Sequence, residues 1–118
     1  MRVDVYWNLH KDCYSIRACE GPQKGRVIAH TDDVSLIAAT FVVRATARAK
    51  VIETHCKSVH AWVRGELADT IALNGLVGVT YNPYREATFV RRADRSPILQ
   101  SSRVRMTIVD GRANVSAA

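Results

Sequence analysis

The amino-acid sequence predicts a mainly β protein, α+β at most, with a compact antiparallel curved sheet of barrel or sandwich form and one short helix around residues 45–54. Three observations predict this fold class. Most segments alternate apolar and polar residues with a period of two, which is typical of strands with one buried face. Turn-forming residues separate these segments at short intervals. The length of 118 residues, with 47% apolar residues and no internal repeat or linker, indicates a single β-rich domain over residues 1–118.

The N-terminal segments are predicted to form a hairpin. Val3 and Val5 alternate with polar residues over 2–9, which indicates a strand with one buried and one polar face. A tight connection at 10–12 leads to a second alternating segment, residues 13–19. We therefore expect these two strands to pair in antiparallel fashion.

The next segments continue the β pattern and then give way to a helix. A turn, a short strand, a polar interruption and a long apolar strand are predicted in that order over residues 21–25, 26–30, 31–33 and 34–43. The β-branched content of the long segment favours a buried strand, although a short helix within it fits the pattern as well. Residues 45–54 are rich in alanine and hold neither Gly nor Pro, so this segment is the predicted helix.

The rest of the chain returns to short strands. Alternation predicts a strand over 59–64, and Asn74-Gly75 indicates a surface loop or irregular hairpin within 66–78. Further strands, with a hairpin turn at Asp110-Gly111, are expected over residues 79–81, 88–91, 103–108 and 113–115. The tail, residues 116–118, is expected to fray.

The positive charge of the chain is carried mainly by arginine. Thirteen of the 17 basic residues are Arg, the formal net charge is +6, and the densest positive region is 85–112. Guanidinium groups match phosphate or carboxylate, and aromatic rings stack on bases, although core aromatics and a solvated arginine face fit the same pattern. The candidate binding residues are Tyr81, Tyr84, Arg85, Arg91, Arg92, Arg103 and Arg105.

No catalytic signature accompanies these residues. The sequence has no P-loop, no dinucleotide fingerprint, no nucleophile elbow and no metal-ligand spacing. We therefore expect a protein that is not an enzyme and has no cofactor and no metal site. The three cysteines are expected to be idle thiols. A less favoured hypothesis is a metal-dependent nuclease or phosphoesterase that uses His10, His30, His55 or His60.

The sequence resembles a group of small proteins encoded in bacteriophage and prophage genomes, over the runs VDVYWNLHKDCYSIR, GRVIAH, SVHAWVRG and VTYNPYREATFV. This resemblance extends from Val3 to about Val90. It implies a phage accessory protein that acts in the cytoplasm of a bacterial host. Small proteins of that kind often block host defence systems, as CRISPR inhibitors do.

The resemblance thus implies an anti-CRISPR-like protein that binds and inhibits a bacterial defence complex, whether protein or ribonucleoprotein, through a basic Arg-rich face. The basic charge argues against DNA mimicry and favours guide RNA, an acidic protein surface or a nucleotide second messenger. The alternative is a module that binds RNA or DNA directly, because it needs the same positive surface. No membrane contact is expected, since no apolar run approaches the ~20 residues of a span. Short exposed strand edges would let two copies pair as a homodimer.

Overall fold

The computed structural model describes residues 1–118 as nine strands and one helix, which confirms the mainly β prediction. The elements are β1 (Arg2–Asn8), β2 (Cys13–Ala18), β3 (Val27–Thr31), β4 (Asp33–Val43), α1 (Ala45–Thr54), β5 (Ala61–Ala68), β6 (Val77–Thr80), β7 (Val90–Arg91), β8 (Gln100–Val109) and β9 (Arg112–Ala117). All strands belong to one open antiparallel sheet in the order β3-β2-β1-β5-β4-β8-β9-β6-β7. The predicted β1–β2 hairpin and the helix over 45–54 are both present.

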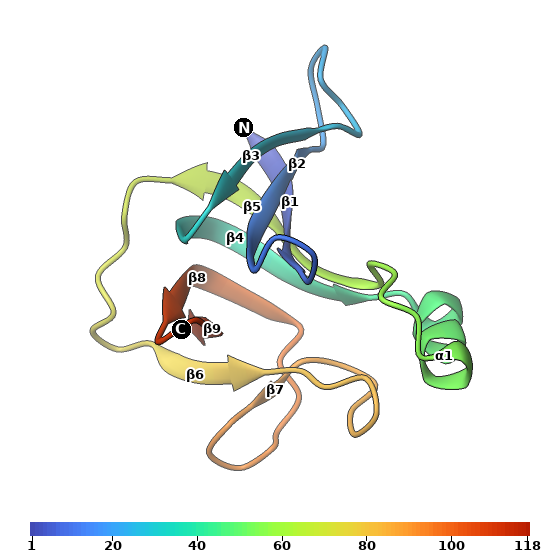
Figure 1. Cartoon of the computed structure of the whole chain (residues 1–118). Coiled ribbons are helices and arrows are strands. Elements are labelled where there is room, and N and C mark those ends of the chain that lie inside the picture. The colour runs from blue at the N-terminus through green and yellow to red at the C-terminus, as the bar shows by residue number, and fades with distance from the viewer.

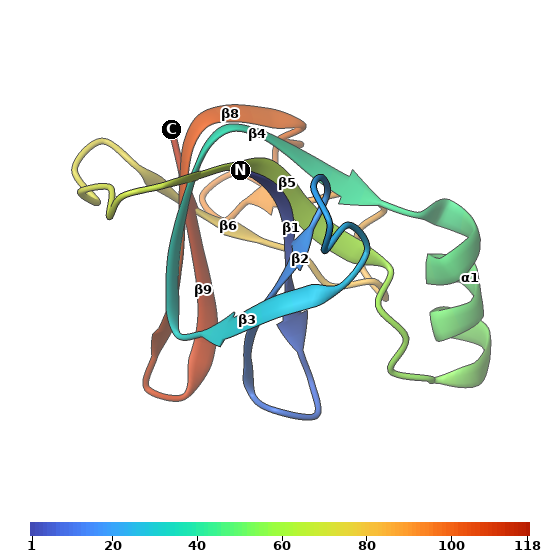
Figure 2. The same cartoon turned by 90° about the horizontal axis from the view of Figure 1, so that it is seen from above.

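The sheet curves back on itself, so that its two halves face each other across a common core (Figure 1). The first half is β3-β2-β1-β5-β4 and the second is β8-β9-β6-β7, and they join where β4 pairs with β8. Seen from above, β4 and β8 run together across the top of the molecule (Figure 2). Val5, Leu36 and Val63 from the first half and Val79 and Val104 from the second are fully or almost fully buried.

A bulge in β4 produces part of this curvature. The register between β4 and β5 shifts between Ile37 and Thr40, and Ala38 has a left-handed φ of 50°. Such bulges bend a strand and increase its twist. Gly65 of β5 lies against the bulge, because a Cβ at this position would meet the carbonyl oxygen of Ile37 at 2.9 Å.

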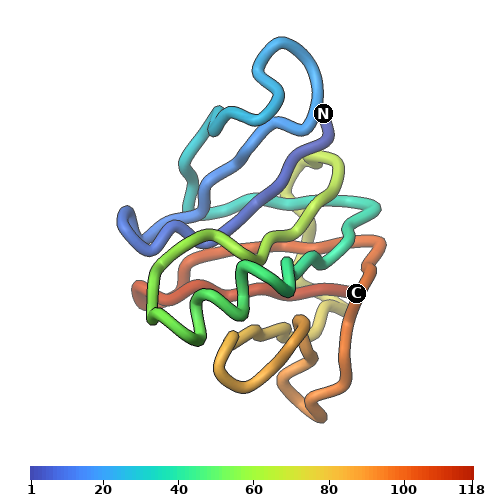
Figure 3. Tube along the Cα trace, turned by 90° about the vertical axis from the view of Figure 1, so that its right-hand side faces the viewer, coloured from blue at the N-terminus to red at the C-terminus, as the bar shows by residue number.

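Helix α1 follows directly from β4 and lies beside the sheet rather than within it (Figure 1). The helix ends at Thr54, and its C-cap residue is His55, whose φ of 54° is left-handed and whose N–H bonds to the carbonyl of Val51. Val51 is its one buried residue, and Arg48 Nε donates to the Pro83 carbonyl at 3.1 Å. Helix α1 and the segment after β6 therefore lie on the same side of the molecule (Figure 3).

Two predictions about the C-terminal half are wrong. Strand β5 continues to Ala68, inside the predicted loop, because its last three residues pair with Ile37, Leu36 and Ser35 of β4. Residues 116 and 117 of the tail that was expected to fray belong to β9, which pairs with β8 on one side and β6 on the other. Ala117 is fully buried, and Ala118 N donates to the Arg103 carbonyl.

Asp4 lies on the predicted polar face of β1, but it is buried rather than solvated, with only 3% of its surface exposed. Its carboxylate accepts hydrogen bonds from Arg64 Nε at 2.7 Å and from Arg17 at 3.1 Å. Burial alone would raise the pKa of Asp4, but these hydrogen bonds outweigh burial and hold the pKa below its usual value. A charged cluster thus covers the outer face of β1, β2 and β5. No helix in the structure is both long and apolar enough to pass through a bilayer.

Candidate functional site

Four arginines lie on the outer face of the second half of the sheet. Cross-strand partners share a face, and the register places Arg105 opposite Ser116 and Ser116 opposite Gly78. Arg92 packs its side chain over Gly78, where a Cβ would meet Arg92 Cδ at 3.1 Å. Arg103 lies two residues from Arg105 on β8, so strand alternation places it on the same face. At the far end of the β8–β9 hairpin, Arg112 pairs with Val109, which shares this face as well. We call Arg92, Arg103, Arg105 and Arg112 the arginine face.

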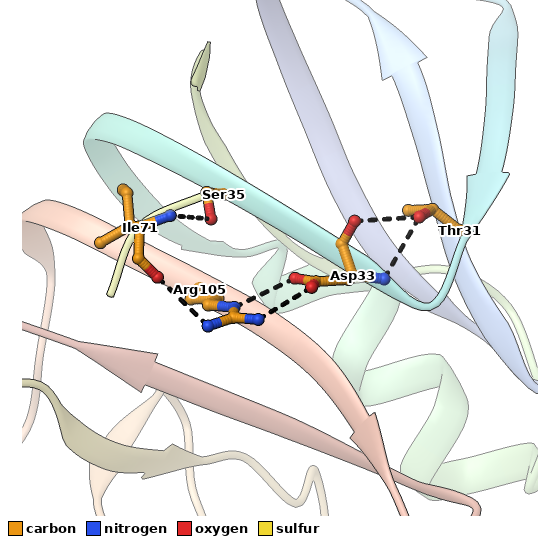
Figure 4. Close-up of polar contacts among 5 residues, drawn as sticks. All are labelled: Thr31, Asp33, Ser35, Ile71 and Arg105. Carbon is orange, nitrogen blue, oxygen red and sulfur yellow. Dashed lines mark hydrogen bonds and ion pairs between the residues drawn. The ribbon is translucent and has the colours of Figure 1, made fainter. Parts of the chain in front are cut away.

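Arg105 differs from the other members because its charge is balanced within the protein (Figure 4). Its guanidinium donates to both carboxylate oxygens of Asp33, at 3.1 and 2.9 Å, and to the Ile71 carbonyl at 3.3 Å. The Ile71 N–H in turn bonds to the hydroxyl of Ser35, which holds the segment after β5 across β4. Arg92, Arg103 and Arg112 are exposed and make no ion pair, so they carry the free charge of this face.

The other predicted binding residues lie elsewhere. Arg91 donates to the Ser96 hydroxyl and the Pro97 carbonyl, so its side chain stabilises a turn. Arg85 is exposed in the turn formed by residues 82–86. Tyr81 and Tyr84 belong to a pocket that the sequence did not predict.

This pocket, which we call the aromatic pocket, begins where the sheet opens between β1 and β5. The β1–β5 ladder ends at the Val5–Val63 pair, and residues 6–9 and 58–62 then line a cavity of about 800 Å³. Helix α1 and the segment after β6 complete its walls. Aromatic pairs line two sides, with ring centroids 5.2 Å apart for Trp7–Tyr14 and 5.1 Å apart for Tyr81–Phe89.

Polar groups gather at one end of the aromatic pocket. His55 stacks on Tyr84 with centroids 5.7 Å apart, and His60 Nε2 lies 2.9 Å from the Tyr81 hydroxyl. His60 Nδ1 lies 3.2 Å from the Ser58 carbonyl, which can only accept, so in the neutral ring Nε2 accepts from Tyr81. Burial raises the pKa of Tyr81, which keeps this hydroxyl a donor.

A thiol with a lowered pKa and a buried indole also line the aromatic pocket. Hydrogen bonding, first from Ser58 and then from Thr54, lowers the pKa of Cys56 to about 7. Trp62 is 9% exposed, yet its Nε1 has no acceptor. The sequence marked neither residue as a binding residue, because the segments that form the pocket are far apart in the chain. The one evident aromatic-cationic run, which holds Tyr81, Tyr84 and Phe89, does not include them.

His10, His55 and His60 all line the aromatic pocket, but the four histidines do not form one cluster. His30 Nδ1 lies 2.9 Å from the Ser15 hydroxyl, while His55 and His60 pair with separate tyrosines and His10 is exposed. No three His, Cys, Asp or Glu side chains lie close enough together to hold a metal ion. The structure therefore shows no set of metal ligands that would support the hypothesis of a metal-dependent nuclease. The three cysteines are free thiols.

Fold and sites together define a small antiparallel β protein with a cationic outer face and an aromatic pocket. A sequence model of the family described as "Mycobacterium phage L5 gene 82 protein" matches residues 1–114. The gene 82 protein of Mycobacterium phage L5 is 42% identical over 112 residues, and the match covers 88% of each chain. The chain belongs to this phage protein family, which confirms the phage origin that the sequence implied. No solved structure matches the chain.

Proposed function

We propose that this protein is a non-catalytic phage accessory protein that binds and inhibits a bacterial defence complex, as anti-CRISPR proteins do. The observation that supports this proposal is the arginine face, where three unpaired guanidinium groups share the outer surface of neighbouring strands. The carboxylate of Asp33 forms an ion pair with Arg105, so it does not neutralise the other three arginines. A surface of this kind attracts acidic protein or phosphate and speeds the encounter with such a partner.

The test of this proposal is a charge reversal on the arginine face. The double variant Arg103→Glu with Arg112→Glu changes two exposed residues and leaves Arg92, which also lines the aromatic pocket, unchanged. Lys11→Glu with Lys24→Glu is the matched control, because it makes the same charge change at exposed turns of the first half. We expect the native protein and the control to raise phage plating on a host with active defence, and the arginine-face variant to lose this effect.

Tagged protein from the same host should also co-purify with the defence complex, and the arginine-face variant should not. Equal phage protection by the variant and the control would contradict the proposed surface. Failure of the native protein to protect phage against any defence system of its host would contradict the proposed function itself.

Direct binding of RNA or DNA is a second candidate, because free arginines on one face also suit a phosphate backbone. Salt titration separates this candidate from the first. A nucleic-acid complex would weaken steeply with salt, and the double variant would lower the slope of log K against log salt by roughly one per lost contact. Affinity without such a slope would exclude this second candidate.

A further inference from the structure

The aromatic pocket has the composition of a site for a small aromatic anion. Its volume of about 800 Å³ lies in the range of small-molecule sites, and most of its lining residues are apolar. Lys57 lines it and no Asp or Glu does, while the side chain of Arg92, which borders the pocket, lies over Gly78 on the arginine face. We propose that this pocket binds a nucleotide, with the base among the aromatic rings and the phosphate at the polar end. This inference does not depend on the proposed function of the arginine face.

The walls of the pocket suit a planar ring. The Trp7–Tyr14 and Tyr81–Phe89 pairs come from opposite halves of the curved sheet, so a ring between the halves meets aromatic faces or edges on both sides. Every base has a π-face that stacks on such side chains. The ladder between β1 and β5 already ends at Val5–Val63, so a ligand beyond this pair displaces no strand hydrogen bond.

The charge at the polar end suits a phosphate. Val51 and His55 line the pocket, and Arg48 lies three residues before Val51 on the same face of α1, whereas helical spacing places Glu53 on another face. Arg48 reaches the Pro83 carbonyl beside Tyr84. The carboxylate of Glu86, in the turn after β6, is already bound by Asn82 N and by Arg95. The end of the pocket thus keeps an excess of positive charge.

Intrinsic fluorescence tests this proposal directly, because the chain has two tryptophans and both line the pocket. The purified protein is titrated with AMP, GMP, UMP and a cyclic dinucleotide, and with adenosine, inorganic phosphate and indole-3-acetate as comparisons. We expect saturable quenching by at least one nucleotide, confirmed by calorimetry. Adenosine and phosphate, which each supply one half of the ligand, should bind at least roughly tenfold more weakly.

Two variants of equal charge change show whether binding occurs in this pocket. Lys57→Glu places a carboxylate at the polar end, whereas Lys24→Glu changes an exposed turn far from it. We expect Lys57→Glu to weaken nucleotide binding by roughly tenfold and Lys24→Glu to change it less than about twofold. Thermal melting of both variants checks that they fold.

Three results would overturn the proposal. The first is the absence of quenching and heat with every nucleotide up to about 1 mM. The second is an equal effect of Lys57→Glu and Lys24→Glu, which would place binding elsewhere. The third is tighter binding of indole-3-acetate than of every nucleotide, which would make the ligand a different aromatic acid. The variant Arg103→Glu with Arg112→Glu should bind nucleotide as the native protein does. Failure of the proposed function of the arginine face can therefore be told apart from failure of the nucleotide proposal.

Discussion

Cys56 and Cys19 are two thiols of one chain whose surroundings shift their pKa values in opposite directions. The Ser58 hydroxyl lies 3.5 Å from Cys56 Sγ, and hydrogen bonding there stabilises the thiolate and lowers its pKa to about 7. Burial, and then the neighbouring carboxylate of Asp4, raise the pKa of Cys19. Since the thiolate is the nucleophile, Cys56 is the more reactive of the two near neutral pH.

We therefore predict that iodoacetamide alkylates Cys56 before Cys19, and that the rate at Cys56 rises with a midpoint near pH 7 as the thiolate forms. Peptide mapping by mass spectrometry across a pH series measures both rates. Ser58→Ala should move the midpoint upward, toward the ordinary thiol value of about 8.5. Equal rates at the two cysteines, or a midpoint that Ser58→Ala leaves in place, would contradict this prediction.

The ionisation of Asp4 contributes to the stability of the fold. Its pKa is lower in the folded protein than in the unfolded chain, so its contribution is fully present above the unfolded value of about 3.9. That contribution is lost as the pH falls through the lower folded value. Asp4→Asn should lower the free energy of unfolding at neutral pH by roughly 1–3 kcal/mol, because it weakens hydrogen bonds to Arg64 and Arg17.

Urea denaturation at several pH values tests this prediction. The loss of stability below about pH 4 should be shallower in Asp4→Asn than in the native protein. Asp69→Asn, an exposed aspartate with no ion pair, is the control and should change stability by less than about 0.5 kcal/mol. If both variants behave alike, the buried cluster around Asp4 does not stabilise the fold.

At the scale of elements, the contact between the β4 bulge and Gly65 sets how closely β4 and β5 approach. A methyl group on Gly65 would lie 2.9 Å from the Ile37 carbonyl oxygen and 3.2 Å from Leu36 Cβ, and both belong to backbone or core. We predict that Gly65→Ala lowers the free energy of unfolding by about 1–3 kcal/mol, since the strands have to shift. Chemical denaturation measures the change.

Ala38→Gly is the matched variant on the other side of the same bulge. Ala38 is exposed and has a left-handed φ of 50°, a conformation that costs an alanine more than a glycine. This variant should leave stability unchanged or raise it by up to about 1 kcal/mol. A loss of stability in Ala38→Gly as large as that in Gly65→Ala would show that the bulge, rather than the close approach, governs stability.

Elements with a local signal could be predicted from the sequence, and those fixed by distant partners could not. The helix over 45–54 has its own alanine-rich composition, and the β1–β2 hairpin has alternation on both sides of a tight turn. Residues 66–68 and 116–117 have no such signal and are strands because β4 and β6 pair with them. The buried carboxylate of Asp4 depends on arginines 13 and 60 residues away.

The candidate sites show the same limit. Alternation on β8 was enough to place Arg103 and Arg105 on one face, but not to show that Asp33 binds Arg105. Tyr81 and Tyr84 could be named because they stand in one aromatic-cationic run. Trp7 and Tyr14 lie far from that run in the chain, and they line the same pocket because the sheet folds over on itself.

At the scale of the whole molecule, stability depends on how firmly the two halves of the open sheet are held together. Pairing between β4 and β8 joins them along one side. Phe41 of β4 packs on Phe89, just before β7, with ring centroids 5.1 Å apart. On the other side, Tyr14 of β2 reaches across the core, and its hydroxyl donates to the carbonyls of Thr107 and Asn114, each at 3.2 Å.

Tyr14 thus links the first half to the β8–β9 hairpin, and its burial raises the pKa of its phenol, so the hydroxyl stays a donor. We predict that Tyr14→Phe lowers the free energy of unfolding by about 1 kcal/mol and speeds amide exchange in β8 and β9, because the ring remains but the link is lost. Tyr6→Phe is the control, since the Tyr6 hydroxyl bonds to no group, and it should change stability by less than about 0.5 kcal/mol. Denaturation and hydrogen exchange measure the two effects. Unchanged exchange in β8 and β9 of Tyr14→Phe would mean that core packing alone, without this hydrogen-bonded link, keeps the open side of the sheet closed.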